Sequence, residues 1–143
     1  MAFSDALANS LLGWFKGSAF VTAPSTTLHL SLHTGEPGPA GTQSDVTTAV
    51  AGGRAAMPVA DLGAIGSDAA GGRVISVEAI VNFTNSALAV GQISHVGIWS
   101  AASAGTFYAG AALTQSASVQ VGDIVRIPIG GLRLRAVGYM PPP

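Results

Sequence analysis

The chain has 143 residues, with six lysines and arginines, seven aspartates and glutamates, and no cysteine. This length suits a single domain, and the lack of cysteine excludes a disulfide framework and any metal site with thiolate ligands. A net charge of −1 without a basic run argues against binding to nucleic acid or to an anionic membrane. No apolar run approaches the ~18 residues that indicate a membrane-spanning helix.

The scarcity of charge is the most unusual property of the sequence. Only 9% of the residues are charged, whereas ordinary soluble domains have about 25%. The mean hydropathy is +0.48. A soluble monomer needs more charge than this on its surface. We therefore expect the chain to be a subunit of an assembly, with much of its surface covered by other protein.

A short amphipathic helix is predicted in an N-terminal arm formed by residues 1–17. Ser4 is a favourable N-cap, and Gly17 is a favourable residue just beyond the end of the helix. Large apolar side chains recur at helical spacing along one face, namely Phe3, Leu7, Leu11, Trp14 and Phe15. This face has two possible partners, the chain's own core or a neighbouring protein. We favour a neighbouring subunit or larger partner, because a domain built from strands has less need of one terminal helix.

From residue 27 onward the apolar residues recur with a period of two. Residues 27–34 place three leucines on one face of a strand and polar residues on the other, respectively Leu28, Leu30 and Leu32, and His29, Ser31 and His33. A loop rich in glycine and proline follows at residues 35–41. Residues 46–50 and 55–59 are weaker strand candidates, and residues 61–72 resemble an exposed loop.

The second half of the chain continues this pattern. Residues 74–83 form the strongest predicted strand, followed by strands at 93–99, 107–113, 119–121, 124–129 and 132–137. About seven to nine short strands separated by turns are typical of an all-β sandwich or small barrel. We predict a jelly-roll-like β-sandwich over residues 18–143. Its expected core consists of Leu28, Leu30, Leu32, Ile75, Val77, Val81, Phe83, Ile93, Trp99, Phe107 and Leu134.

The sequence contains no constellation that predicts catalysis or a cofactor. His29 and His33 are four residues apart on one strand, roughly 13 Å at the strand rise, which is too far to share a metal ion. The nucleophile elbow, the H-E-x-x-H zinc motif and the phosphate-binding Walker loop are all missing. A glycosidase with paired carboxylates is the remaining enzymatic alternative, because distant residues can converge in a fold. We expect no enzyme activity, no metal and no cofactor.

Two segments of the sequence resemble a known family. Residues 28–38 read Leu-His-Leu-Ser-Leu-His-Thr-Gly-Glu-Pro-Gly, and Gly41 and Thr42 follow. Residues 94–99 read Ser-His-Val-Gly-Ile-Trp, with Ala109-Gly110, Leu113-Thr114 and Val121-Gly122-Asp123 after them. Together these segments resemble small virion proteins of tailed bacteriophages, which are described as head-decoration or tail-fibre-like proteins. The similarity spans residues 4–135, with departures at Ser100, an aspartate in the family, and at Gly52-Gly53-Arg54, where the family has Y-A-R.

The resemblance implies a structural protein of the virion. One possible role is a capsid decoration or cement protein, a trimer seated where subunits of the major capsid protein meet. The alternative is a tail or tail-fibre component that recognises a host surface. We favour decoration, because the sequence has no fibre shaft or second domain, and its aromatic residues lie mostly in predicted strands and the helix.

The expected partners are copies of the same chain, in a homotrimer, and the major capsid protein or tail proteins. Arg133 and Arg135 lie on a predicted strand and must face solvent or a partner. The residues predicted to form interfaces are Phe3, Leu7, Leu11, Trp14, Phe15, His29, His33, Arg133 and Arg135.

Overall fold

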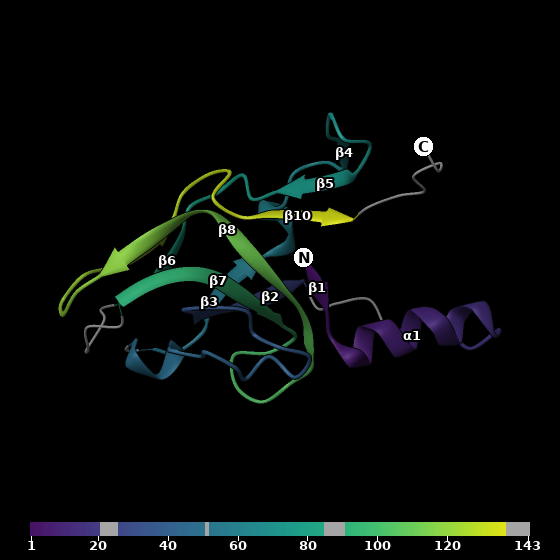
Figure 1. Ribbon diagram of the computed structural model, residues 1–143, viewed down its shortest axis with the longest axis horizontal. Coiled ribbons are helices and arrows are strands. Elements are labelled where there is room, and N and C mark those ends of the chain that lie inside the picture. Colours follow the sequence, from purple (N-terminus) through teal and green to yellow (C-terminus); the bar gives the residue numbers. More distant parts are fainter. Residues whose placement is uncertain (21–25, 51, 85–90, 137–143) are drawn as a thin grey trace.

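The computed structural model describes residues 1–20, 26–50, 52–84 and 91–136, and shows three antiparallel sheets with one α-helix near the N-terminus (Figure 1). The largest sheet has five strands in the order β1 (Ala2–Phe3), β8 (Phe107–Val119), β7 (Gly91–Trp99), β2 (Thr27–His33) and β3 (Ala55–Pro58). A second sheet has the order β10 (Arg133–Ala136), β5 (Arg73–Ser76) and β4 (Gly66–Ser67). The third pairs β6 (Val81–Phe83) with β9 (Val125–Ile127). The helix α1 spans Asp5–Phe15.

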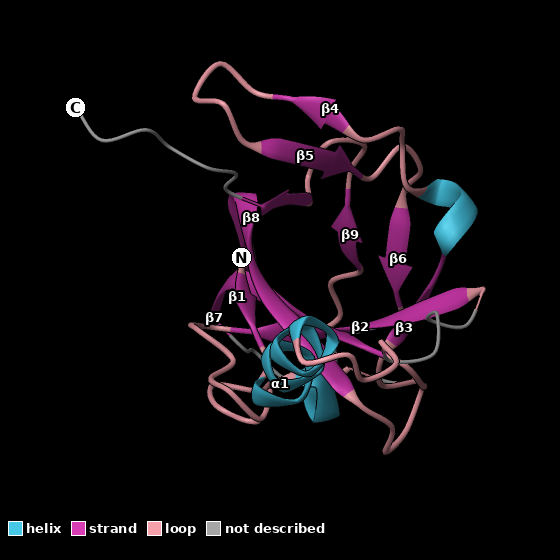
Figure 2. Cartoon of the chain, turned by 90° about the vertical axis from the view of Figure 1, so that its right-hand side faces the viewer, coloured by secondary structure: helices cyan, strands magenta, loops and turns pink. Residues whose placement is uncertain are grey.

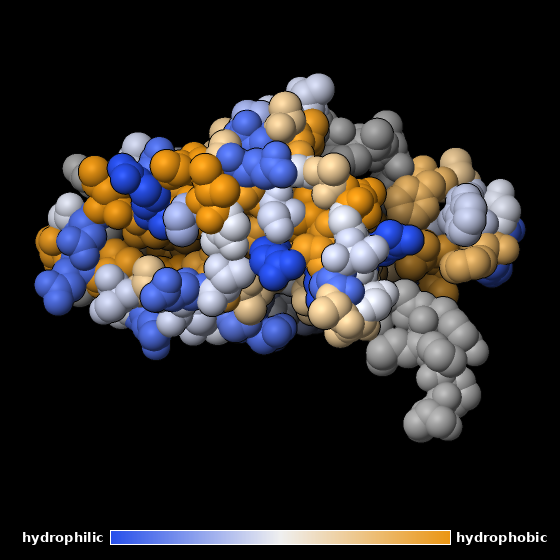
Figure 3. Space-filling view, turned by 90° about the horizontal axis from the view of Figure 1, so that it is seen from above, coloured by the Kyte–Doolittle hydropathy of each residue, from blue (hydrophilic) through white to orange (hydrophobic). Residues whose placement is uncertain are grey.

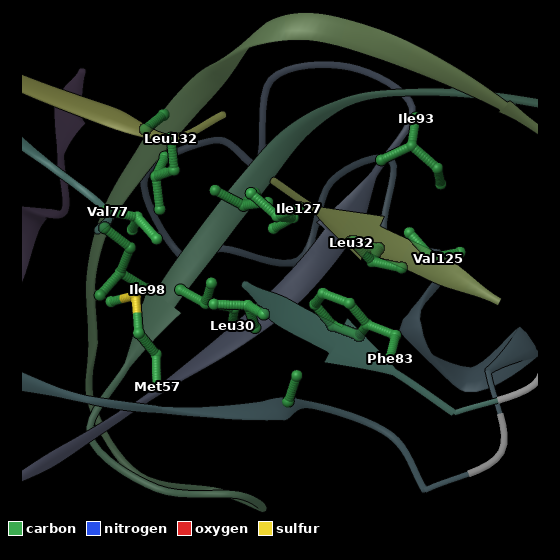
Figure 4. Close-up of a cluster of buried hydrophobic side chains, with 14 of the residues drawn as sticks. Leu30, Leu32, Met57, Val77, Phe83, Ile93, Ile98, Val125, Ile127 and Leu132 are labelled. Carbon is green, nitrogen blue, oxygen red and sulfur yellow. The ribbon is translucent and has the colours of Figure 1, made fainter. Parts of the chain in front are cut away.

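The hydrophobic core lies between the five-stranded sheet and the β6–β9 pair. Leu30, Leu32 and Ile93 enter it from the large sheet, and Phe83 and Ile127 enter it from the opposite side (Figure 4). All five side chains are at most 2% exposed. Burial of such side chains is the main driving force of the fold. The prediction of an all-β, sandwich-like fold with one N-terminal helix is confirmed.

The predicted strand at residues 74–83 is two strands in two different sheets. β5 ends at Ser76, and β6 begins at Val81. Between them the backbone of Val77 bonds to Leu132 and Gly130, so the chain leaves one sheet before it joins the next. Val77, Val81 and Phe83 nevertheless share the core, whereas Ile75 and Ala79, which have the same even spacing, are only partly buried.

Three other boundaries differ from the sequence prediction. Residues 46–50 contain a 3-10 helix at Thr47–Ala49 instead of a strand. The strand predicted at 107–113 continues to Val119 as β8, and the separate strand predicted at 119–121 does not form, because residues 120 and 121 lie in the turn that follows β8. The predicted loop at 61–72 contains the two-residue strand β4, and another 3-10 helix, at Val59–Asp61, precedes it. Short elements of this kind depend on tertiary contacts more than on local sequence.

The predicted core residues do not all belong to one cluster. Most lie in the main cluster, and a second layer on the other face of the large sheet contains Trp99 and Phe107. Trp99 and Phe107 are buried, with ring centroids 5.0 Å apart, but outside the main cluster. Ile75 and Leu134 face each other across β5 and β10, and both are only partly buried. The remaining predicted core residues, Leu28, Leu30, Leu32, Val77, Val81, Phe83 and Ile93, belong to the main cluster.

The last predicted strand, at 132–137, corresponds to β10, and its residue Val137 lies outside the described residues. The helix α1 ends two residues before Gly17, the last residue of the predicted arm. The division of the chain into residues 1–17 and 18–143 stays a prediction.

Candidate functional site

The N-terminal helix forms as the sequence predicts. The hydroxyl of Ser4 accepts a hydrogen bond from the backbone N–H of Leu7 at 3.1 Å, which caps the first turn. At the other end, Gly17 adopts a φ of +84°, a conformation that glycine reaches without strain. The N–H of Ser18 then bonds to the carbonyl of Gly13 and closes the helix.

The helix is attached to the strands almost entirely through its first residues. β1 pairs with β8, with Ala2 opposite Gly110 and Phe3 opposite Ala109. The N–H of Ser4 donates to the carbonyl of Tyr108 at 2.8 Å. Beyond this attachment α1 extends away from the sheets (Figure 1), and none of its residues is buried.

The apolar side chains of the arm are therefore exposed to solvent in the single chain. Phe15 is 73% exposed, Leu12 is 62% and Trp14 is 55%. Phe3 and Leu11 are also exposed, and Leu7 is half-buried. The rings of Trp14 and Phe15 touch edge to face at a centroid distance of 5.2 Å. A continuous patch of this kind on a soluble protein marks an interaction surface.

His33 does not lie on a surface, and its assignment to an interface is wrong. Its side chain is fully buried, because residues of the loop after β2 fold back over this face of the sheet. Nδ1 of His33 donates to the carbonyl of Gln43 at 2.8 Å. Nε2 accepts from the hydroxyl of Ser31 at 2.7 Å, and that hydroxyl accepts from Nε1 of Trp99 at 2.9 Å.

The hydrogen bond between Ser31 and His33 resembles that between a catalytic serine and its general base, but no substrate can reach these two buried side chains. Both side chains are 0% exposed, and the hydrogen bond from Trp99 occupies the serine oxygen. Burial lowers the pKa of His33, while its bond to the Gln43 carbonyl and the charge of Asp45 act in the opposite direction. The pair is neutral and has a structural role. Its chain of hydrogen bonds, a buried relay from Trp99 through Ser31 and His33 to the Gln43 carbonyl, holds the loop after β2 against the sheet.

The residues that carry the family resemblance are the ones that pack this loop onto the sheet. Pro37 is buried against Gly110, where an added Cβ would lie 2.9 Å from the proline ring. Gly41 has a φ of +73°, and a Cβ there would lie 2.5 Å from the ring of Phe107. Both glycines are therefore required for close packing, and the motif has a structural role.

His29 and His95 differ from His33. His29 is half-buried, and its Nδ1 is buried without a hydrogen-bond partner. Nδ1 of His95 lies 2.8 Å from the hydroxyl of Ser94, and its Nε2 lies 3.8 Å from the exposed carboxylate of Glu36. In the described part of the chain, no three His, Cys, Asp or Glu side chains come together as ligands for a metal ion.

The two arginines of β10 have different environments. Arg133 is exposed, as an interface residue requires. Arg135 instead forms an ion pair with Asp68, which lies 67 residues earlier in the chain. The hydrogen bond from Arg135 and the backbone N–H of Gly72 lower the pKa of Asp68 to about 2. Arg135 therefore ties the turn after β4 to β10 within its own chain.

Sequence reasoning missed two further features. Arg54 lies over the ring of Trp99, and it bonds to the loop at 101–105. A groove between β8 and β9 has a volume of about 490 Å³. Neither has a local sequence signal, because each is formed by residues far apart in the chain. Among the described residues, no helix has the length and apolar character needed to cross a membrane.

The comparison with protein families agrees with the resemblance. A family model described as "Podophage GP4 fiber I protein gp80" matches residues 2–135, which include the helix α1 and all the described strands except the last residue of β10. The search of curated proteins gave no match. The match covers far more than half of the chain. The chain therefore belongs to the podophage GP4 fiber I protein gp80 family and is a structural protein of a bacteriophage virion.

Proposed function

We propose that this chain is a subunit of a phage fibre, held in the virion through the apolar face of its N-terminal helix. The observation that carries the proposal is that no residue of α1 is buried in the chain's own core. Leu12, Trp14 and Phe15 are each more than half exposed, although they are among the most apolar or aromatic residues of the sequence. The description of the family supports the fibre as the location.

The energetics favour a covered helix. Burial of apolar surface contributes about 25 cal/mol per Å², and one aromatic side chain can bury about 150–250 Å². Phe3, Trp14 and Phe15 alone therefore offer several kcal/mol of association free energy. The same face left in water would promote aggregation. The helix is thus best explained as an anchor between subunits, and a homotrimer is the assembly that we expect.

Capsid decoration is the second candidate, and the low charge supports it. The protein has 13 charged residues on a surface of 8089 Å². Such a surface suits broad contact with neighbouring shell subunits as well as contact within a fibre. In both roles the protein is structural and performs no catalytic step.

Counting copies per particle separates the two roles. Quantitative mass spectrometry of purified virions should find a few to tens of copies for a fibre, and hundreds for a decoration protein. Immunogold labelling with antibody against the purified chain should mark the tail or the head accordingly. A count of hundreds with gold on the head would overturn the fibre assignment.

A further inference from the structure

The groove between β8 and β9 lies where a continuous hairpin would be expected. The two strands are consecutive in the chain and are joined by the turn at residues 120–124. They belong to different sheets, however, and β9 pairs with β6 instead (Figure 2). This edge of β8 is instead approached by the segment just before β10, where a bridge joins Leu113 to Leu132 and the N–H of Thr114 donates to the carbonyl of Gly131. The groove of about 490 Å³ lies between residues 113–117 of β8 and residues 125–131, which include β9.

This separation leaves one edge of β8 available for pairing. On that edge β1 pairs only opposite Ala109 and Gly110. Within the described residues, no strand continues this pairing along residues 115–119. Backbone groups at a sheet edge readily accept an added strand, and β1 shows that this edge does so elsewhere along β8.

The lining of the groove indicates what kind of strand fits. Val125 and Ile127 line the groove but are only 4% and 2% exposed, because their side chains belong to the core, whereas Ile129 is 64% exposed and offers accessible apolar surface. Apolar side chains gather at the end of the molecule where β8 ends (Figure 3). Arg126 is the one charged residue among the described lining residues, and its Nε bonds to the side chain of Asn82 at 3.0 Å. Among the described residues, the other N–H groups of this guanidinium form no hydrogen bond. They are therefore available to bind a carboxylate of a partner in the groove.

We propose that the groove binds an extended segment of another virion protein, which adds to β8 as a strand and places an acidic side chain beside Arg126. Backbone hydrogen bonds to residues 115–119 supply affinity, and apolar side chains that pack on the exposed Ile129 supply selectivity. The inference rests on the chain being a virion subunit. It does not depend on whether the subunit lies in the fibre or on the head.

Photo-crosslinking in assembled virions tests the proposal. A photoreactive amino acid replaces Gln115, which is exposed on the free edge of β8, and in a control it replaces Ala56, which is exposed on β3 at the opposite edge of the sheet. Mass spectrometry of the product from position 115 should identify one short stretch of a different virion protein that contains an acidic residue. Crosslinks to a second copy of this chain, or the same products from positions 115 and 56, would overturn the proposal.

Substitutions test the strand pairing and the role of Arg126 separately, and folding controls distinguish both effects from misfolding. Arg126→Glu should lower the crosslink yield at least tenfold, whereas Arg73→Glu, at an exposed arginine on β5, should not. Ser116→Pro removes a backbone donor on the same edge as the N–H of Thr114 and should reduce incorporation into virions, whereas Ser116→Ala should not. Circular dichroism and thermal unfolding of the free proteins verify folding before assembly. Normal incorporation of folded Ser116→Pro would exclude strand addition, and an undiminished yield for Arg126→Glu would exclude the carboxylate. Copy number and gold labelling test the location separately.

Discussion

The guanidinium carbon of Arg54 lies 3.6 Å from the centroid of the Trp99 ring. The same guanidinium donates from Nη1 to the carbonyls of Ala101 and Ala104 at 3.0 and 2.8 Å. One side chain from the residue just before β3 therefore connects the end of β7 to the loop at 101–105. This contact orders a loop that would otherwise have little packing of its own.

Arg54→Ala should destabilise the protein by about 1–2 kcal/mol, because it removes a cation–π contact and two hydrogen bonds from a charged donor. Urea unfolding followed by circular dichroism measures the loss. Arg73→Ala is the matched control, since Arg73 is exposed and bonds to the hydroxyl of Ser67, and it should change stability by less than about 0.5 kcal/mol. Equal effects of the two substitutions would mean that the Arg54 contacts contribute nothing.

Trp99→Ala should cost about 3–5 kcal/mol, as expected for a large buried aromatic side chain. Trp99 is 7% exposed, and it packs on Phe107 and Gly41. Trp99→Phe should cost less than Trp99→Ala, because it keeps an aromatic ring in the site, although it still loses the hydrogen bond from Nε1 to Ser31. Thermal unfolding of the two variants beside the parent provides the comparison. A Trp99→Ala protein that melts like the parent would show that this second layer is dispensable.

The limits of the sequence prediction are clearest at this second layer. The alternation in β2 correctly placed Leu28, Leu30 and Leu32 in the core. The same alternation placed His33 on an exposed face, because a period of two distinguishes two faces but cannot show that a loop covers the second. The cover depends on Pro37 against Gly110 and on Gly41 against Phe107, which are contacts between residues about 70 positions apart. Arg135 and Asp68 are a further example, since no local pattern joins residues so distant.

The buried relay makes stability depend on pH. Burial lowers the pKa of His33 in the folded protein, whereas the unfolded chain has an ordinary value near 6.5. The unfolded state therefore binds the proton more readily, and protonation favours unfolding. We expect stability to be fully present above about pH 7 and to decrease as the pH falls through 6.5 toward the folded-state pKa. Urea midpoints between pH 5 and 8 measure this decrease.

His33→Gln should weaken this pH dependence, because the variant has no titrating group at the relay. His95→Gln serves as the control, since it leaves the bonds of His33 to Ser31 and Gln43 in place. A parent protein whose urea midpoint is constant from pH 8 to 5 would contradict the role assigned to His33.

Attachment to the virion should depend little on salt. The chain offers six basic and seven acidic residues, and Arg135 and Asp68 are already paired with each other. Salt screens exposed ion pairs but strengthens apolar contacts. Virions washed from low to molar sodium chloride should therefore retain the protein, as measured by gel densitometry of the pellet. Release at moderate salt would show that ion pairs hold it.

The exposed face of α1 gives the most direct test of the anchor. Leu12→Glu combined with Phe15→Glu places two charges on side chains that are 62% and 73% exposed. The single chain should keep its circular dichroism spectrum and melting temperature, because substitutions at exposed positions rarely change stability by more than about 0.5 kcal/mol. Self-association and incorporation into virions should both be lost, because charges would be buried in an apolar contact. Multi-angle light scattering measures the mass, expected to be that of a trimer for the parent.

Asn9→Glu is the matched control, since Asn9 is an exposed polar residue of the same helix and a charge there should leave assembly intact. Removal of residues 1–17 extends the test, because it also removes the pairing of β1 with β8. The remaining strands should keep their spectrum, since the core residues of the main cluster all lie after residue 27. A truncated protein that unfolds would show that the arm completes the fold of its own chain. A double glutamate variant that still assembles and enters virions would show that another surface anchors the protein.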